Sequence, residues 1–231
     1  MNRTAFASIL GLGLALSLAA APPVFAGQPG PGAGRGGPRP PSVPAVKDPK
    51  AALAGAYRLD PNHIAIVARL GHANGISVSV FRFDTARGTL AWDPANPSAI
   101  KIEVTVDPAS VNTNLKNFAA QIAGEGLLNA AKFPEIKFVS TAFRPVGPTH
   151  AQVDGDFTFM GQTKPVTIDV DLVGIGRAPV GRMSIGFSGT LKFKRTDYGF
   201  NAQMGDIGED VTVMLDGEFL QIPPPPPPAA L

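Results

Sequence analysis

The 231-residue chain contains no cysteine, one tryptophan and two tyrosines. Without cysteine it can form no disulfide, no thiolate metal site and no cysteine nucleophile, and it cannot be a lipoprotein anchored through cysteine. Charged residues are also sparse, at 16% of the chain, and the formal net charge is +2. This balance gives no reason to expect nucleic acid as a partner.

Long apolar runs are absent except at the amino terminus, where one extends from Ala5 to Ala21 behind a single positive charge, Arg3. The small residues Val24 and Ala26 then occupy the positions that define a cleavage site. We therefore expect residues 1–26 to be a secretory signal peptide cleaved after Ala26. The alternative is a membrane anchor, because the run approaches the roughly 20 residues that span a bilayer.

Two segments lack any apolar periodicity. Residues 27–52 begin with a stretch dominated by Gly and Pro, and residues 222–231 contain six consecutive prolines. Such segments bury too little apolar surface to offset their ordering entropy. We expect a disordered linker over 27–52 and a Pro-rich spacer over 222–231, with a folded domain at 53–221 between them.

Within 53–221, apolar and polar residues alternate with a period of two, the pattern of strands that bury one face. In residues 101–107, Ile102, Val104 and Val106 share one face, whereas Lys101 and Glu103 lie on the other. The same pattern predicts further strands at 64–70, 76–83, 88–92, 135–144, 153–159, 166–172, 183–194 and 211–219. One segment instead shows helical spacing, and it predicts a short helical insertion at about 114–131.

About eight or nine antiparallel strands, each apolar on one face, need two stacked sheets or a closed barrel. Closure removes exposed strand edges, so we expect an all-β protein built as a closed antiparallel barrel. The charged residues fall on the face opposite the apolar one, which predicts an apolar interior and a solvated exterior. Such an interior is filled by its own side chains or holds one lipid-like ligand.

The sequence offers few candidates for catalytic or metal-binding residues. The nearest approach to a nucleophile elbow, at residues 186–189, lacks the G-x-S-x-G spacing. His63 and His72 lie at opposite ends of a predicted strand and at an odd separation, so they should point to opposite faces. No carboxylate is spaced to complete a metal site with either one. We therefore expect no catalytic residue, no metal and no cofactor other than a bound lipid.

Several blocks of the sequence resemble the YceI family. They include DPNHIAIVARLGH at 60–72, VDPASVNTN at 106–114, FPEIKFVST at 133–141 and FKRTDYGFN at 193–201, and the resemblance covers about 57–221. It implies a lipocalin-like barrel located in the periplasm, which carries a polyisoprenoid lipid such as an isoprenoid quinone or a prenyl phosphate without catalysing a reaction. It also implies a homodimer, and the basic residues of the linker suggest transient contact with a membrane surface.

The sequence departs from the family pattern at Ile64, Ala68 and Phe81, where the family usually has Ser, Phe and Gly. The segment that is a charged helix in the family is here the apolar NFAAQIAGEGLLN, residues 117–129. We therefore expect the opening of the barrel to be more apolar than is usual for the family.

Inward aromatic and aliphatic residues are the predicted ligand contacts: Ile66, Phe81, Phe83, Phe118, Ile122, Leu127, Phe138, Phe157, Phe159, Phe187 and Phe193. Arg69, Arg195 and Asp197 are the predicted polar contacts near the opening, and Arg82 is a further candidate. Two alternatives stay open. One is a binding module for a shorter amphiphile or an amide-like molecule, and the other is a hydrolase or metal enzyme.

Overall fold

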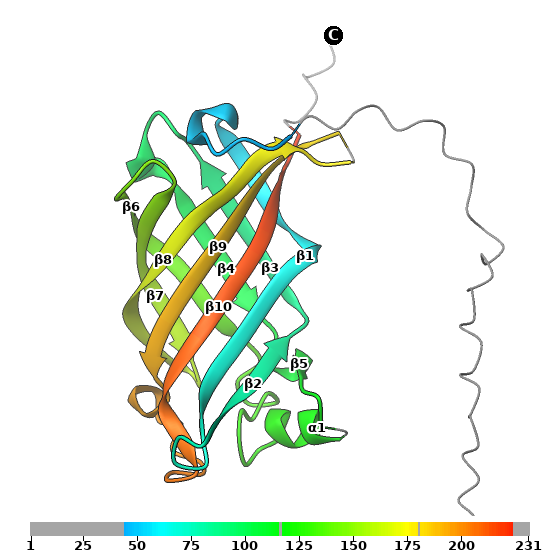
Figure 1. Ribbon diagram of the computed structural model, residues 1–231, viewed down its shortest axis with the longest axis vertical. Coiled ribbons are helices and arrows are strands. Elements are labelled where there is room, and N and C mark those ends of the chain that lie inside the picture. Colours follow the sequence, from blue (N-terminus) through cyan, green and yellow to red (C-terminus); the bar gives the residue numbers. More distant parts are fainter. Residues whose placement is uncertain (1–43, 116, 180, 224–231) are drawn as a thin grey trace, which may run out of the picture. The chain divides into compact units, whose positions relative to one another are not determined.

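The computed structural model describes residues 44–115, 117–179 and 181–223. The expected signal peptide, residues 27–43 of the expected linker and residues 224–231 of the expected tail lie outside the described part. The described residues form ten strands, one α-helix and four 3-10 turns (Figure 1). The strands are β1 Gly55–His72, β2 Ser77–Phe83, β3 Ala86–Trp92, β4 Lys101–Val106, β5 Val111–Asn112, β6 Ile136–Pro145, β7 His150–Phe159, β8 Gln162–Arg177, β9 Met183–Lys194 and β10 Ile207–Gln221. The helical elements are η1 Pro49–Ala51, η2 Pro97–Ala99, η3 Pro108–Ser110, α1 Phe118–Ala123 and η4 Arg195–Tyr198.

Eight of the strands close into a ring. Their order is β1, β3, β4, β6, β7, β8, β9 and β10, and β10 pairs with β1 to complete the circle. All of these pairings are antiparallel, so the expected closed antiparallel barrel is confirmed. The remaining strands, β2 and β5, extend the sheet beside the second half of β1.

Strand β1 has two partners on one side. Its first residues, 55–58, pair with β3, and residues 66–72 pair with β2, while β10 runs along its other side (Figure 1). Between Leu59 and Ile64 the pairing with β10 is interrupted by a bulge that contains Pro61. The strand is therefore much longer than the predicted 64–70, because a bulge accommodates a proline that a regular ladder cannot.

The apolar side of each strand faces the barrel interior. In β1, Ile66 and Leu70 are buried whereas Arg69 between them is exposed, as the alternation predicts. The same arrangement holds in β7, where Val153, Phe157 and Phe159 are buried. The interior positions of all these strands join one hydrophobic core.

The helical insertion is shorter than the predicted 114–131. Helix α1 spans only Phe118–Ala123, and Gly124 at its end has extended backbone angles, φ −71° and ψ 173°. Gly124 and Gly126 favour an end to the helix because glycine loses more backbone entropy there than other residues. Residues 124–133 form successive turns instead. No helix in the described part of the chain is long and apolar enough to cross a membrane.

The packed domain begins before the predicted boundary at residue 53. The backbone of Val46 exchanges two hydrogen bonds with Ile175 on β8, at 2.9 and 2.8 Å, and Ala52 is only 2% exposed. A Cβ atom at Gly174 would lie 3.0 Å from the Cβ of Ala45, so this glycine permits the close approach. Residues 45–52 therefore pack on the barrel.

Candidate functional site

The barrel encloses an apolar cavity of about 1100 Å³. This is at or above the upper end of the range typical of small-molecule sites, about 300–1000 Å³. Twelve of the fourteen predicted contact residues line the cavity: Ile66, Phe81, Phe83, Phe118, Ile122, Leu127, Phe138, Phe157, Phe159, Phe187, Phe193 and Arg195. The period-two pattern was sufficient to select the inward positions, and α1 adds Phe118 and Ile122 from outside the ring.

One end of the cavity is closed by aromatic rings. Phe187 lines the cavity, and Trp92 packs against it with ring centroids 5.9 Å apart. Phe143 also contacts the indole, edge to face, at 6.2 Å between ring centroids. Beyond these rings lies a separate, smaller cavity of about 290 Å³, which Trp92 lines. A ligand in the main cavity therefore reaches its inner limit at Phe187.

The cavity opens to solvent at the other end of the barrel, beside β2 and the segment that leads to α1. Val78, Val80 and Leu115 line the cavity, yet they are 50%, 49% and 56% exposed. Ile76, in the turn before β2, is 86% exposed. This apolar rim agrees with the expectation that the opening is apolar.

Aromatic side chains are concentrated in the wall of the cavity. Phe157, Phe159, Phe193 and Tyr198 contact one another, with ring centroids between 5.1 and 6.3 Å apart. Most of these contacts are tilted or edge to face, the arrangements that the ring quadrupole favours. Burial raises the pKa of the Tyr198 phenol above its ordinary value. The cluster gives the cavity a wall of interlocked rings.

Arg195 has a structural role that differs from the predicted polar contact. The residue is 1% exposed, and the N–H groups of its guanidinium donate to the carbonyl oxygens of Phe200, Ala202, Ile207 and Gly208 at 2.7 to 2.8 Å. A fifth contact goes to the Met204 sulfur at 3.5 Å. All five donors of the guanidinium are thus engaged. Arg195 holds the 199–208 loop against the barrel and has no donor left for a ligand.

The other two predicted polar contacts do not reach the cavity. Arg69 lies on the outward face of β1, and Asp197 is exposed in η4. Arg69 faces outward because it occupies an odd position on a strand whose even positions point inward. Arg82 of β2, the further candidate, does line the cavity, and it forms an ion pair with Asp84 at 2.8 Å.

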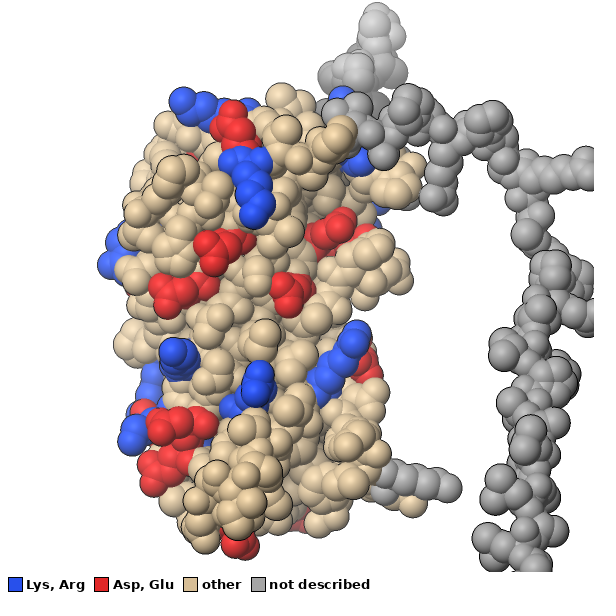
Figure 2. All heavy atoms as spheres, in the orientation of Figure 1, with Lys and Arg blue, Asp and Glu red and all other residues tan. Residues whose placement is uncertain are grey.

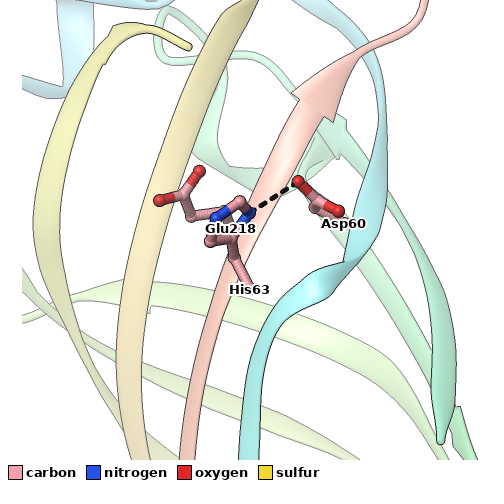
Figure 3. Close-up of side chains that lie close together, drawn as sticks. All are labelled: Asp60, His63 and Glu218. Carbon is pink, nitrogen blue, oxygen red and sulfur yellow. Dashed lines mark hydrogen bonds and ion pairs between the residues drawn. The ribbon is translucent and has the colours of Figure 1, made fainter. Parts of the chain in front are cut away.

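Outside the barrel, His63 lies between two carboxylates (Figure 3). Its Nδ1 is 2.8 Å from Oδ2 of Asp60, and the nearest ligand atoms of Asp60, His63 and Glu218 all lie within 4.8 Å of one another. The hydrogen bond to Asp60, then the charges of Glu218 and Asp60, raise the pKa of His63. The same hydrogen bond, with the Asn62 backbone N–H, lowers the pKa of Asp60.

The expectation that no carboxylate is spaced to complete a metal site with His63 was therefore wrong. The Asp-x-x-His spacing at 60–63 was the one available signal, but it becomes meaningful only once the bulge in β1 is known. Glu218 is distant in sequence and could not have been assigned. As predicted, His63 and His72 do not share a site, because His72 lines the cavity and contacts Ser77 Oγ at 3.1 Å.

The chain resembles known proteins both in sequence and in fold. The family model described as a YceI-like domain matches residues 57–219. The chain belongs to the YceI family. A UPF0312 protein of Shewanella sp. strain ANA-3 is 36% identical over 169 residues, which cover 72% of this chain and 88% of the relative. A UPF0312 protein of Shewanella oneidensis is 34% identical over the same shares of the two chains.

Solved structures of other proteins share the fold. BcnA of Burkholderia cenocepacia superposes with a TM-score of 0.62 at 22% identity, covering 69% of this chain and 98% of that one. A polyisoprenoid binding domain from Saccharophagus degradans, implicated in plant cell wall breakdown, gives a TM-score of 0.54 at 15% identity, covering 74% and 100%.

The three positions that are expected to depart from the YceI-family pattern, Ile64, Ala68 and Phe81, all line the cavity. Ala68 pairs with Phe81 across β1 and β2, so a small residue and a large one face each other. The side chains at these positions therefore help to set the shape of the cavity rather than the outside of the barrel.

Proposed function

We propose that this protein is a non-enzymatic carrier that holds one long isoprenoid lipid in the barrel, with its head group at the opening beside β2. The observation that supports this function most is the cavity itself, which is about 1100 Å³ in volume and walled by phenylalanine and aliphatic side chains. Burial of apolar surface there is favourable by about 25 cal/mol per Å², less the entropy lost by the ligand.

The size of the cavity sets the length of chain it accepts. At the roughly 30 Å³ that a water-sized group occupies, the cavity holds about 37 non-hydrogen atoms. That number corresponds to about seven isoprene units of five carbons each. A shorter amphiphile would leave apolar wall uncovered, which is why we favour the longer ligand.

The rim supports transfer of a lipid to and from a membrane. Ile76, Val78, Val80 and Leu115 expose apolar surface at the opening, and Arg82 adds a cation. Figure 2 shows Lys and Arg interspersed with Asp and Glu over the visible face of the barrel. We propose that the rim contacts the membrane surface transiently and that the protein works in the periplasm, as a cleaved signal peptide would require.

The head group is either a quinone or a phosphate. Both leave the same apolar chain in the cavity, and both place a polar group near Arg82 at the opening. A phosphate would compete with Asp84 for the guanidinium, whereas a quinone would leave that ion pair in place. The two arms of the experiment below distinguish these ligands.

The test is uptake by delipidated protein from vesicles that contain either an isoprenoid quinone or a prenyl phosphate, followed by mass spectrometry of the complex. We expect one unmodified lipid per barrel in at least one arm. Val80→Asp at the rim should slow uptake, and Val173→Asp, which is 53% exposed on β8 and outside the cavity lining, should not. Uptake of neither lipid, or recovery of a cleaved product, would contradict the proposal.

A further inference from the structure

The bulge in β1 brings three metal-binding side chains together on the outer wall of the barrel. The register with β10 passes from Leu59 opposite Phe219 to Ile64 opposite Gly217, so the four residues 60–63 face only Glu218. The chain arches out at this point and carries Asp60 and His63 over Glu218 (Figure 3). None of the three lines the lipid cavity.

The distances between the three ligand atoms are close to those found around a single bound metal ion. Two ligand atoms bound to one Zn²⁺ at about 2.1 Å each are at most about 4.2 Å apart. The ligand atoms of Asp60, His63 and Glu218 lie within 4.8 Å of one another, so the widest pair needs to close by about 0.6 Å. Asp60 Oδ2 and His63 Nδ1, at 2.8 Å, are already as close as adjacent ligands of one ion.

Neighbouring residues orient both carboxylates. Oδ1 of Asp60 accepts hydrogen bonds from the backbone N–H of Asn62 at 3.0 Å and from its Nδ2 at 3.3 Å, which directs Oδ2 toward His63. Oε2 of Glu218 accepts from the hydroxyl of Ser184, a residue only 8% exposed, at 3.1 Å. Outer partners of this kind fix the ligands of protein metal sites.

We propose that Asp60, His63 and Glu218 bind a divalent transition-metal ion such as Zn²⁺. One imidazole nitrogen and two carboxylate oxygens suit zinc, which takes nitrogen and oxygen ligands, better than Mg²⁺ or Ca²⁺, which prefer oxygen alone. The side chain of His63 is 61% exposed, so the ion is accessible and water completes its coordination. The bound ion would join β1 to β10 at the bulge, and this role is independent of lipid binding.

A second histidine provides a matched contrast. His150 also lies near two aspartates, but its Nδ1 faces Asp171 at 3.0 Å while its Nε2 faces Asp169 at 3.9 Å. Because the two ring nitrogens point away from each other, a single ion cannot bind this histidine together with both carboxylates. The His150 cluster therefore has similar composition without the geometry of a site.

The experiment is calorimetric titration of the full chain with zinc chloride, using protein purified without a polyhistidine tag and stripped by a chelator. We expect one saturable Zn²⁺ per chain and no saturable Mg²⁺. Ser184→Ala should weaken Zn²⁺ binding about tenfold, which is the lower end of the effect seen when a residue that hydrogen-bonds a metal ligand is removed. His63→Ala and Glu218→Gln remove a ligand itself and should weaken binding further. His150→Ala should bind as the wild type does.

Thermal unfolding provides the second readout. Because a ligand that binds only the native state stabilises it, zinc should raise the unfolding midpoint of the wild type and of His150→Ala, but not that of His63→Ala. The exposure of His63 means that this variant should fold, and circular dichroism checks that it does. The proposal would be overturned if the wild type showed no saturable Zn²⁺ binding. It would also be overturned if the His63→Ala and Glu218→Gln variants bound Zn²⁺ with the affinity of the wild type.

Discussion

Filling the cavity at Ala68 should shorten the lipid that the barrel holds. Ala68 lies on the inward side of β1, opposite Phe81 on β2 and Val213 on β10, and lines the cavity. In Ala68→Phe the ring adds six carbon atoms, which displace about six ligand atoms at roughly 30 Å³ each. These atoms amount to a little over one isoprene unit. Burying one unit contributes up to about 4 kcal/mol to the binding free energy, at about 0.8 kcal/mol per buried carbon and before ordering losses.

The assay measures the affinity of delipidated protein for isoprenoid alcohols of increasing length. Affinity should rise with each unit until the cavity is full, at about seven units in the wild type and about six in Ala68→Phe. The control is Ala65→Phe on the same strand, which does not line the cavity. The reasoning is refuted if Ala68→Phe folds, as judged by its unfolding transition, and its affinity stops rising at the same length as the wild type.

Three further predictions concern stability. Arg195→Met leaves four carbonyl oxygens without their donor and should cost at least about 3 kcal/mol in urea unfolding; a loss below 1 kcal/mol would contradict the role assigned to this residue. Gly155→Ala places a Cβ 2.5 Å from the Phe138 ring, so the same measurement should show a loss of about 1–3 kcal/mol, and an unchanged midpoint would refute the clash. Burial raises the pKa of both phenols, Tyr57 and Tyr198, so the native state holds their protons more tightly. Stability should therefore fall as pH rises above about 10, and phenolate absorbance should appear at a higher pH in the folded protein than in urea-unfolded protein; identical phenolate titration in the two states would contradict this.

The fold was largely predictable because alternation depends on local sequence. A residue on a strand of a closed barrel must face either the interior or solvent, so Phe157 and Phe159 could be placed inward without knowledge of their neighbours. The length of β1 could not be predicted, since Pro61 normally marks the end of a strand. The extent of α1 was overestimated because Phe118 and Ile122 have helical spacing whether or not the helix continues past Gly124.

Polar residues were harder to assign than apolar ones. Arg195 follows directly after a strand near the opening, and sequence alone cannot show that its donors are taken by backbone carbonyls of a loop that closes later in the chain. Asp60 and His63 are near in sequence, but Glu218 meets them only because β10 closes the barrel against β1. The predicted homodimer stays a prediction.

The most direct test of the carrier function is mass spectrometry of the lipids extracted from gently purified, untreated protein. The account predicts a polyisoprenoid in near-equimolar amount, with a chain long enough to fill a cavity of about 1100 Å³. Recovery of no lipid, or of a short amphiphile without isoprene units, would contradict it.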